Sequence, residues 1–135
     1  MPSIADIVLA DGKATPVNHT FKVKACNNGL STWEDRSTGI AIGYWQLKVK
    51  TEDNANVRKV MMWLNQPVLE ATAGANQAGY TPAAKVAYLP RSYTEFYLPT
   101  RGTTAERADL VAMHSNLMLN SVIKDVIVNG SEFYG

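Results

Sequence analysis

The sequence predicts an α+β fold, in which an antiparallel meander sheet comes first and two helices follow. Apolar and polar residues alternate with period two through most of the chain before Pro99, as in strands that bury one face. After Pro99 the apolar residues recur with helical spacing, and a helix-capping pair opens that stretch. Strands followed by helices are typical of α+β proteins.

Length and composition limit the class of protein. A chain of 135 residues with 46% hydrophobic residues is long enough to bury a core and is predicted to be one domain, 1–135. Its 13 basic and 12 acidic residues give a net charge of +1, so any attraction to nucleic acid or a membrane must be local. The N-terminal residues contain no long apolar run. We therefore expect neither a signal peptide nor a membrane span, and folding in a cytoplasm.

Residues that could carry catalysis or bind a metal are sparse. The single cysteine, Cys26, excludes an internal disulfide, and burial on a strand explains it better than a reactive role. His19 and His114 have no neighbouring ligand at metal-binding spacing, so both are predicted to be structural. Asp6 and Asp11 are better explained as turn residues than as a catalytic pair. Without a phosphate loop, nucleophile elbow or zinc signature, the sequence predicts no enzyme, no metal and no cofactor.

An N-terminal hairpin is predicted over about 4–26. The apolar run 4–9 ends at Asp11-Gly12, a frequent hairpin turn, and residues 17–25 alternate as the second strand. Asn27-Asn28-Gly29 is the next turn. The rest of the sheet is then expected over 30–98.

One strand, predicted over 40–50, organises this sheet. Side chains on a strand alternate between its faces, so the apolar Trp45, Leu47 and Val49 oppose the polar Gln46, Lys48 and Lys50. The polar residues 51–56 are expected to form a loop. Further strands are predicted over 30–34, 57–66 and 85–98, the last broken or bulged at Pro90, which has no amide to donate to a ladder.

A long loop, 68–82, follows Pro67. It is rich in alanine and glycine and is predicted to be flexible. Loops of this length in compact domains are uncommon unless they carry a function or lack order. The sequence leaves both a working loop and a slack connection open.

Two helices are predicted over 103–129. Thr103 and Glu106 form a capping box before a helix over 104–119, and Ser121 is expected to cap a second helix that stops at Asn129-Gly130. Two helices cannot cover one whole sheet, so we expect an obligate oligomer. The apolar stripe expected at its interface consists of Leu110, Val111, His114, Leu117 and Met118.

Several short motifs in this order resemble the coat proteins of single-stranded RNA bacteriophages. The resemblance spreads over Ile7 to Tyr134 and rests on element order and spacing. It is carried by Gly29, Leu30, Trp33, Tyr44 to Lys50, Arg58-Lys59, Pro67, Arg91-Ser92-Tyr93, Thr103, Thr104 and Glu106.

This resemblance implies an intertwined dimer whose helices cross onto the sheet of the partner. Many such dimers would form an icosahedral shell around the RNA genome, assembled in the cytoplasm of a bacterial host and found in the virion. The resemblance also implies that the dimer binds an RNA hairpin at the replicase start and represses translation. The loop 68–82 would adapt around the symmetry axes of the shell, which noncovalent contacts would hold because the loop has no cysteine.

The polar sheet face is the candidate RNA site. Lysines interleaved with aromatic rings suit single-stranded RNA, because lysines meet phosphates and rings stack on unpaired bases. For the lysines alone, a merely solvated face is the alternative. The predicted RNA-binding residues are Gln46, Lys48, Lys50, Lys59, Met61, Trp63, Asn65, Arg91, Tyr93, Glu95 and Tyr97.

The resemblance assigns roles to some of these residues. Tyr93 would stack on a loop base, and Lys48, Lys50 and Lys59 would lie near phosphates. Met61 and Trp63 stand where family members often carry threonine, serine or lysine in a base pocket. The alternative function is a small cytoplasmic dimer that binds an oligonucleotide or apolar ligand on its sheet without forming a shell.

Overall fold

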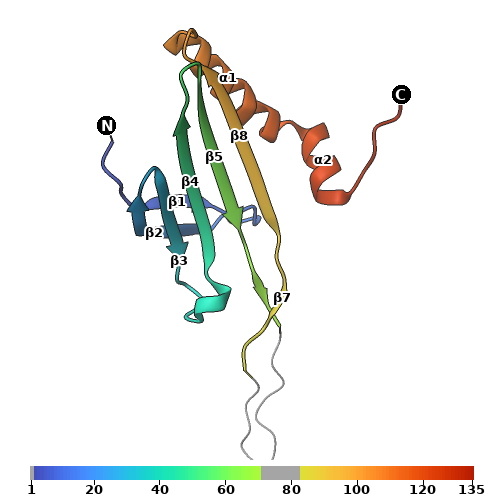
Figure 1. The fold of residues 1–135 in the computed structure, drawn as a ribbon. Helices are drawn as coiled ribbons and strands as arrows, with labels where there is room; N and C mark the ends of the chain where they lie inside the picture. Colours follow the sequence, from blue (N-terminus) through green and yellow to red (C-terminus); the bar gives the residue numbers. More distant parts are fainter. Residues whose placement is uncertain (1, 71–82) are drawn as a thin grey trace, which may run out of the picture. The chain divides into compact units, whose positions relative to one another are not determined.

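The computed structural model describes residues 2–70 and 83–135, which form two compact units, Met1–Tyr97 and Leu98–Gly135. The first unit contains a sheet of six strands in the order β1-β2-β3-β4-β5-β8 (Figure 1). Its consecutive neighbours from β1 to β5 pair antiparallel, which confirms the predicted meander. The strands are β1 (Ile7–Ala10), β2 (Asn18–Asn27), β3 (Leu30–Asp35), β4 (Trp45–Asp53), β5 (Val57–Asn65) and β8 (Arg91–Pro99).

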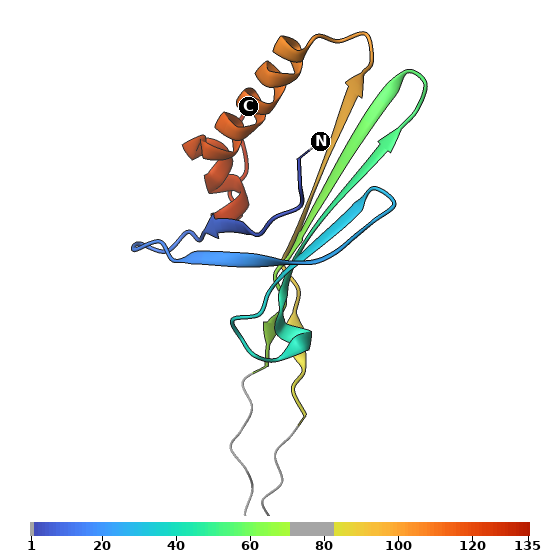
Figure 2. The same cartoon turned by 90° about the vertical axis from the view of Figure 1, so that its left-hand side faces the viewer.

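The predicted N-terminal hairpin is present as β1 and β2, which cross the direction of the long strands β4, β5 and β8 (Figure 2). Alternation along β2 turns Phe21 into the core, where it is 1% exposed. The connection is longer than a two-residue Asp-Gly turn, because the Asp11 amide donates to the carbonyl of Val17. The Asp11 carboxylate also accepts from the amides of Lys13 and Val17, which confirms Asp11 as a turn residue.

A two-residue turn joins β2 to β3. Asn28 and Gly29 both have positive φ, 48° and 79°, as this hairpin turn requires. A bulge at Lys24 separates the pair Val23↔Trp33 from Ala25↔Thr32. The prediction that Cys26 is buried is wrong, because Cys26 lies near the exposed tip of the hairpin, where Asn27↔Leu30 is the last pair before the turn.

The strand predicted over 40–50 starts later and ends later. Ala41–Gly43 form a 3₁₀ turn, η1, and β4 begins at Trp45. Gly43 is buried against Leu69, where a Cβ atom would come within 2.8 Å of the leucine Cδ1. At the other end the ladder continues to Asp53↔Arg58, so residues 51–53 belong to the strand and only 54–56 form the turn.

A short ribbon of β6 (Val68–Leu69) and β7 (Val86–Tyr88) follows the sheet. The predicted break at Pro90 is confirmed, since β7 ends before it and β8 starts after it. The Pro90 carbonyl accepts from the amide of Gln66 at 2.8 Å, which a proline can do without an amide of its own. Residues 71–82 of the predicted flexible loop lie outside the described residues.

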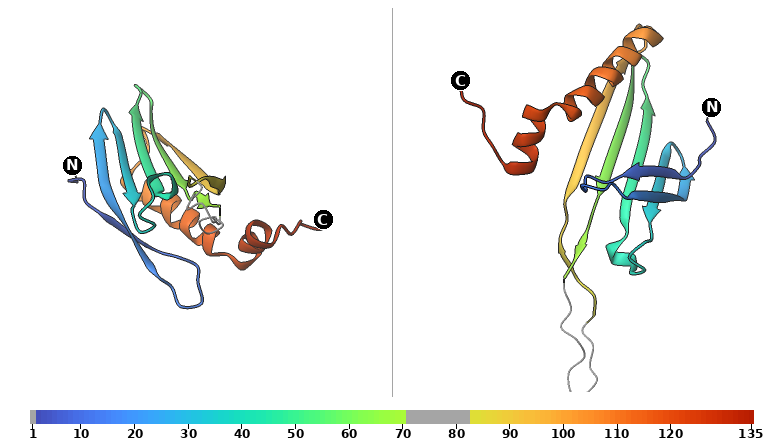
Figure 3. Two further views of the ribbon diagram at one scale, coloured as in Figure 1. Left: turned by 90° about the horizontal axis from the view of Figure 1, so that it is seen from below. Right: turned by 180° about the vertical axis from the view of Figure 1, so that it is seen from behind.

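The second unit contains α1 (Thr104–Leu119) and α2 (Ser121–Asn129), joined by a bend (Figure 3). The capping box of Thr103 and Glu106 is confirmed, with hydrogen bonds of 3.2 Å and 3.1 Å. The predicted cap of α2 is corrected: the side-chain oxygen Oδ1 of Asn120, and not Ser121, accepts from the amides of Val122 and Ile123 at the start of the helix. Gly130, with φ 67°, ends α2 as expected. No helix among residues 2–70 and 83–135 is both long and apolar enough to cross a membrane.

The buried core of the single chain is small. Among the described residues, the buried hydrophobic side chains are Phe21, Trp33 and Met61. Neither α1 nor α2 contains a buried residue, although both carry large apolar side chains such as Leu117 and Ile127. Exposed apolar side chains that gather in a patch mark sites of interaction with another protein or ligand.

Candidate nucleic-acid interface

The pairing of β4 with β5 fixes which side chains share a face. Direct cross-strand partners point to the same side of a sheet. On one side the partners are Gln46↔Asn65, Lys48↔Trp63, Lys50↔Met61 and Glu52↔Lys59. On the other side they include Leu47↔Leu64 and Val49↔Met62. The predicted polar and apolar faces of these strands are therefore confirmed.

Strand β8 adds two tyrosines to the polar side. The rings of Trp63 and Tyr93 lie 5.2 Å apart and tilted by 44°. The ammonium of Lys59 lies 5.2 Å from the ring centre of Tyr97. Because Tyr93, Glu95 and Tyr97 alternate along β8, all three share this side. We call it the polar face, formed by Gln46, Lys48, Lys50, Glu52, Lys59, Met61, Trp63, Asn65, Tyr93, Glu95 and Tyr97.

The tyrosines are the accessible aromatic groups of the polar face. Tyr93 is 52% exposed and Tyr97 is 56% exposed. The Tyr93 hydroxyl donates to a Glu95 oxygen at 2.9 Å. Desolvation and this hydrogen bond raise the pKa of Tyr93, so the hydroxyl remains a neutral donor. The hydrogen bond to Glu95 also orients the ring. An oriented, exposed ring is suited to stacking on an unpaired base.

The lysines of the polar face differ in their partners. Lys50 forms an ion pair with Glu52, with its Nζ 2.7 Å from Oε1. This hydrogen bond lowers the pKa of Glu52, which stays ionised. Within the described part of the chain, Lys48 forms no ion pair. Lys48 is therefore the lysine of β4 whose charge is available to a phosphate.

Other predicted site residues lie at the margins of this face. Arg91 is exposed at the start of β8, and Gln46 and Asn65 face each other at the start of β4 and the end of β5. Met61 is only 9% exposed, which leaves little of it for a ligand. Glu52 was missed because residues 51–56 were predicted to be a loop. The alternation of Lys48, Lys50 and Glu52 is the signal that would have found it.

A second polar cluster surrounds His19. Its Nδ1 lies 2.9 Å from Asp35 Oδ2, its Nε2 lies 3.0 Å from Asp11 Oδ2, and its ring stacks on Trp45 at 4.7 Å. The hydrogen bonds to Asp11 and Asp35 raise the pKa of His19 above its usual 6.5. Burial disfavours ionised Asp35, but the bonds from His19 and Ser37 outweigh it and lower the pKa of Asp35. Through these contacts His19 joins the hairpin to the end of β3.

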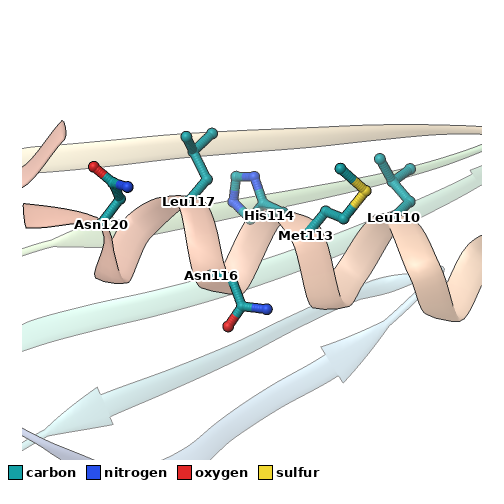
Figure 4. A pocket seen from close by; sticks show the side chains of 6 residues that line it. All are labelled: Leu110, Met113, His114, Asn116, Leu117 and Asn120. Atoms are coloured by element: carbon teal, nitrogen blue, oxygen red, sulfur yellow. The ribbon is translucent and has the colours of Figure 1, made fainter. Parts of the chain in front are cut away.

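Three of the five residues of the predicted helix stripe line an apolar hollow on α1. Leu110, His114 and Leu117 line this hollow of about 510 Å³ together with Met113, Asn116 and Asn120. Figure 4 shows Leu110, Met113, His114, Leu117 and Asn120 on one side of the helix, whereas Asn116 points to the other. Val111 and Met118 are about half exposed and do not line the hollow. Met113, 72% exposed, was missed by the sequence analysis.

The fold is that of coat-protein subunits from phage particles. The virus-like particle of bacteriophage ESE058 has a subunit 34% identical to this chain, with a TM-score of 0.89 over 98% of this chain and 100% of that one. For the virus-like particle of bacteriophage NT-214 the identity is 28% and the TM-score 0.88, with the same coverage. The protein capsid of bacteriophage GA, 20% identical over 97% of this chain and 98% of that chain, shares the fold with a TM-score of 0.78. A comparison with functionally curated proteins found no match.

The sequence also identifies the protein family of this chain. Residues 2–134 match the family model of the levivirus coat protein. The chain belongs to this family. The resemblance stated from sequence motifs is thereby confirmed, as is the α+β fold with its hairpin, meander sheet and two C-terminal helices. The family is one of structural capsid proteins and not of enzymes.

Proposed function

We propose that this protein is the capsid protein of an RNA phage, which assembles as dimers into an icosahedral shell around single-stranded RNA. The polar face of the sheet is the surface that meets the RNA. The observation that carries this proposal is the combination, on one face, of Lys48 with the exposed rings of Tyr93 and Tyr97. The protein then resides in the virion, is assembled in the host cytoplasm, and works as a scaffold without enzymatic activity or cofactor.

The dimer is the building unit in this proposal. Leu110 and Leu117 are 44% and 49% exposed in the single chain, beside the hollow on α1. Burial of such side chains is the main favourable term in obligate association. An interface of about 2,000 Å² or more is expected for that class. The single domain 1–135 is then complete only when the helices of one chain pack on the sheet of another.

RNA recognition divides between charge and stacking. Lysine contacts to phosphates give affinity without sequence preference, whereas bases stacked on rings require an unpaired or looped strand. The polar face offers both, so an RNA hairpin with an exposed loop is its expected ligand. Binding of such a hairpin at the replicase start would make the dimer a translational repressor.

Electron microscopy of the purified chain, together with nuclease digestion, tests the proposal. We expect closed particles that protect RNA from nuclease, and dimers in sedimentation of dissociated material. Particles that do not protect RNA would refute the proposed RNA binding but support the proposed assembly into a shell. A folded dimer that binds oligonucleotides and never closes into particles would instead establish the alternative of a small binding protein. A stable, folded monomer at micromolar concentration would overturn the dimer.

A further inference from the structure

The polar face contains a carboxylate among its lysines. Glu52 Oε1 lies 2.7 Å from Lys50 Nζ, and Lys59 is the direct cross-strand partner of Glu52 on β5. The side chains of Lys50 and Glu52 are 40% and 42% exposed, so both reach solvent. The pKa of Glu52 is lowered, first by the hydrogen bond from Lys50 and then by the charges of Lys50 and Lys59. A full negative charge therefore sits between two of the groups that would meet phosphates.

Such a carboxylate weakens phosphate binding in two ways. A phosphate that binds Lys50 must displace Glu52 from it, and the ionised Glu52 repels the phosphate at short range. Lys48, one pleat away on β4, has no such competitor within the described residues. The three lysines predicted to meet RNA therefore differ in how readily they can bind a phosphate.

We propose that Glu52 is a specificity-determining residue, which lowers the number of RNA phosphates that the polar face neutralises. Binding of arbitrary single-stranded RNA is thereby kept weak, and stacking on Tyr93 and Tyr97 decides which RNA is held. This inference rests on the proposed RNA function of the polar face. In this role Glu52 opposes phosphate binding, which a residue selected only for high RNA affinity would not do.

A purely structural role for this ion pair is a poor explanation. Exposed ion pairs contribute little to folding, because solvent screens them and both side chains lose freedom. Strand β4 is already held here by the backbone ladder that continues to Asp53↔Arg58. Replacing Glu52 should therefore leave the fold intact and change the charge of the face.

The chain offers a closely matched control. Asp53 is the next residue on β4 and points to the opposite side of the sheet, where its Oδ1 lies 3.4 Å from Arg58 Nη1. Glu52→Gln and Asp53→Asn each remove one negative charge and one ion pair from the same strand. They differ in the face that they change. Glu52→Asp, which keeps the charge, separates charge from side-chain shape.

Filter binding of a labelled, mixed-sequence single-stranded RNA to the full chain, over a range of salt concentrations, tests the inference. Glu52→Gln should bind about three- to tenfold more tightly at low salt, and its plot of log affinity against log salt should steepen by about 0.7 for each further phosphate neutralised. Asp53→Asn and Glu52→Asp should stay near wild type, and melting temperatures should be unchanged.

The outcomes separate this inference from the proposed function. If the wild-type chain binds no RNA, the RNA function itself fails. If wild type binds RNA but Glu52→Gln and Asp53→Asn give the same affinity and salt slope, only the role of Glu52 is wrong. Weaker binding by Glu52→Gln would also overturn it, because Glu52 would then support RNA contact instead of opposing it.

Discussion

Lys48 and Trp63 are direct cross-strand partners on β4 and β5, and their side chains leave the same face of the sheet. A cation and a large ring side by side can contact a phosphate and a base of one nucleotide chain. Trp63 in turn touches Tyr93 on β8, so the pair links the lysines of β4 to the exposed tyrosines. This link is the reason to treat the polar face as one surface.

Replacing Lys48 should weaken RNA binding without changing its sequence preference. Lys48→Ala removes one phosphate contact, so the slope of log affinity against log salt should fall in magnitude by about 0.7 for single-stranded RNA. Arg58→Ala is the control, since Arg58 lies on β5 and faces the other side. Salt-dependent filter binding measures both variants. An unchanged slope for Lys48→Ala would mean that Lys48 meets no phosphate.

The placement of Lys48 and Trp63 was predictable because strand periodicity alone decides which side chains share a face. The helix start at Thr103 was predictable because its signal, a capping box, is local. Glu52 was missed because the polar residues 51–56 predicted a loop. In the structure, hydrogen bonding to β5 extends β4 as far as Asp53. The burial predicted for Cys26 rested on its residue type, and it failed because Cys26 lies one residue pair before the turn that joins β2 to β3.

The cluster at His19 could not be predicted for a different reason. Asp35 lies 16 residues from His19 in the sequence, and only the pairing of β2 with β3 brings them together. Both ring nitrogens of His19 face carboxylates, which accept hydrogen bonds, so this geometry requires the doubly protonated ring. The cluster therefore predicts a pH dependence that the sequence did not suggest.

Stability should fall as the pH rises above the usual histidine value. The pKa of His19 is raised from 6.5, so its contribution is complete below pH 6.5 and is lost as the pH rises through the higher folded-state pKa. The pKa values of Asp11 and Asp35 are lowered from 3.8, so their contribution is lost only as the pH falls below 3.8. The cluster should thus contribute most between about pH 4 and 6.5.

Thermal melting across this range tests the cluster. His19→Gln keeps one hydrogen-bond donor but cannot titrate, so its melting temperature should vary less than that of wild type between pH 6 and 9. At pH 6 the variant should be less stable by about 1 to 3 kcal/mol, because buried Asp35 loses a partner. Equal pH dependence in both proteins would show that His19 is not the titrating group.

The two candidate caps of α2 make a direct comparison. Asn120→Ala removes the side-chain oxygen that accepts from the amides of Val122 and Ile123, and should cost about 1 kcal/mol of unfolding free energy. Ser121→Ala changes the first residue of the helix and should lower the unfolding free energy by at most about a few tenths of a kcal/mol. Denaturant unfolding of both variants measures the difference. A larger effect from Ser121 would restore the cap predicted from the sequence.

Trp63 provides the sharpest test of the face assignment, because it could serve either RNA or the core. Trp63 is half-buried on the polar face, whereas Trp33 is 7% exposed and pairs with Leu47 on the apolar side. Trp33→Ala should therefore lose about 3 to 5 kcal/mol of stability, as is usual for a buried tryptophan. Trp63→Ala should lose clearly less, and its main effect should be on RNA affinity.

The contact between Trp63 and Tyr93 sharpens this test further. Tyr93→Ala should reduce RNA affinity on the order of ten- to a hundredfold by removing one stacking surface. Because Trp63 packs against that ring, the losses from Trp63→Ala and Tyr93→Ala should be less than additive in the double variant. Fully additive losses would mean that the two rings bind separate bases. If instead Trp63→Ala destabilises the fold as much as Trp33→Ala and leaves RNA affinity unchanged, Trp63 is a core residue, and the polar face must rely on the tyrosines of β8 alone.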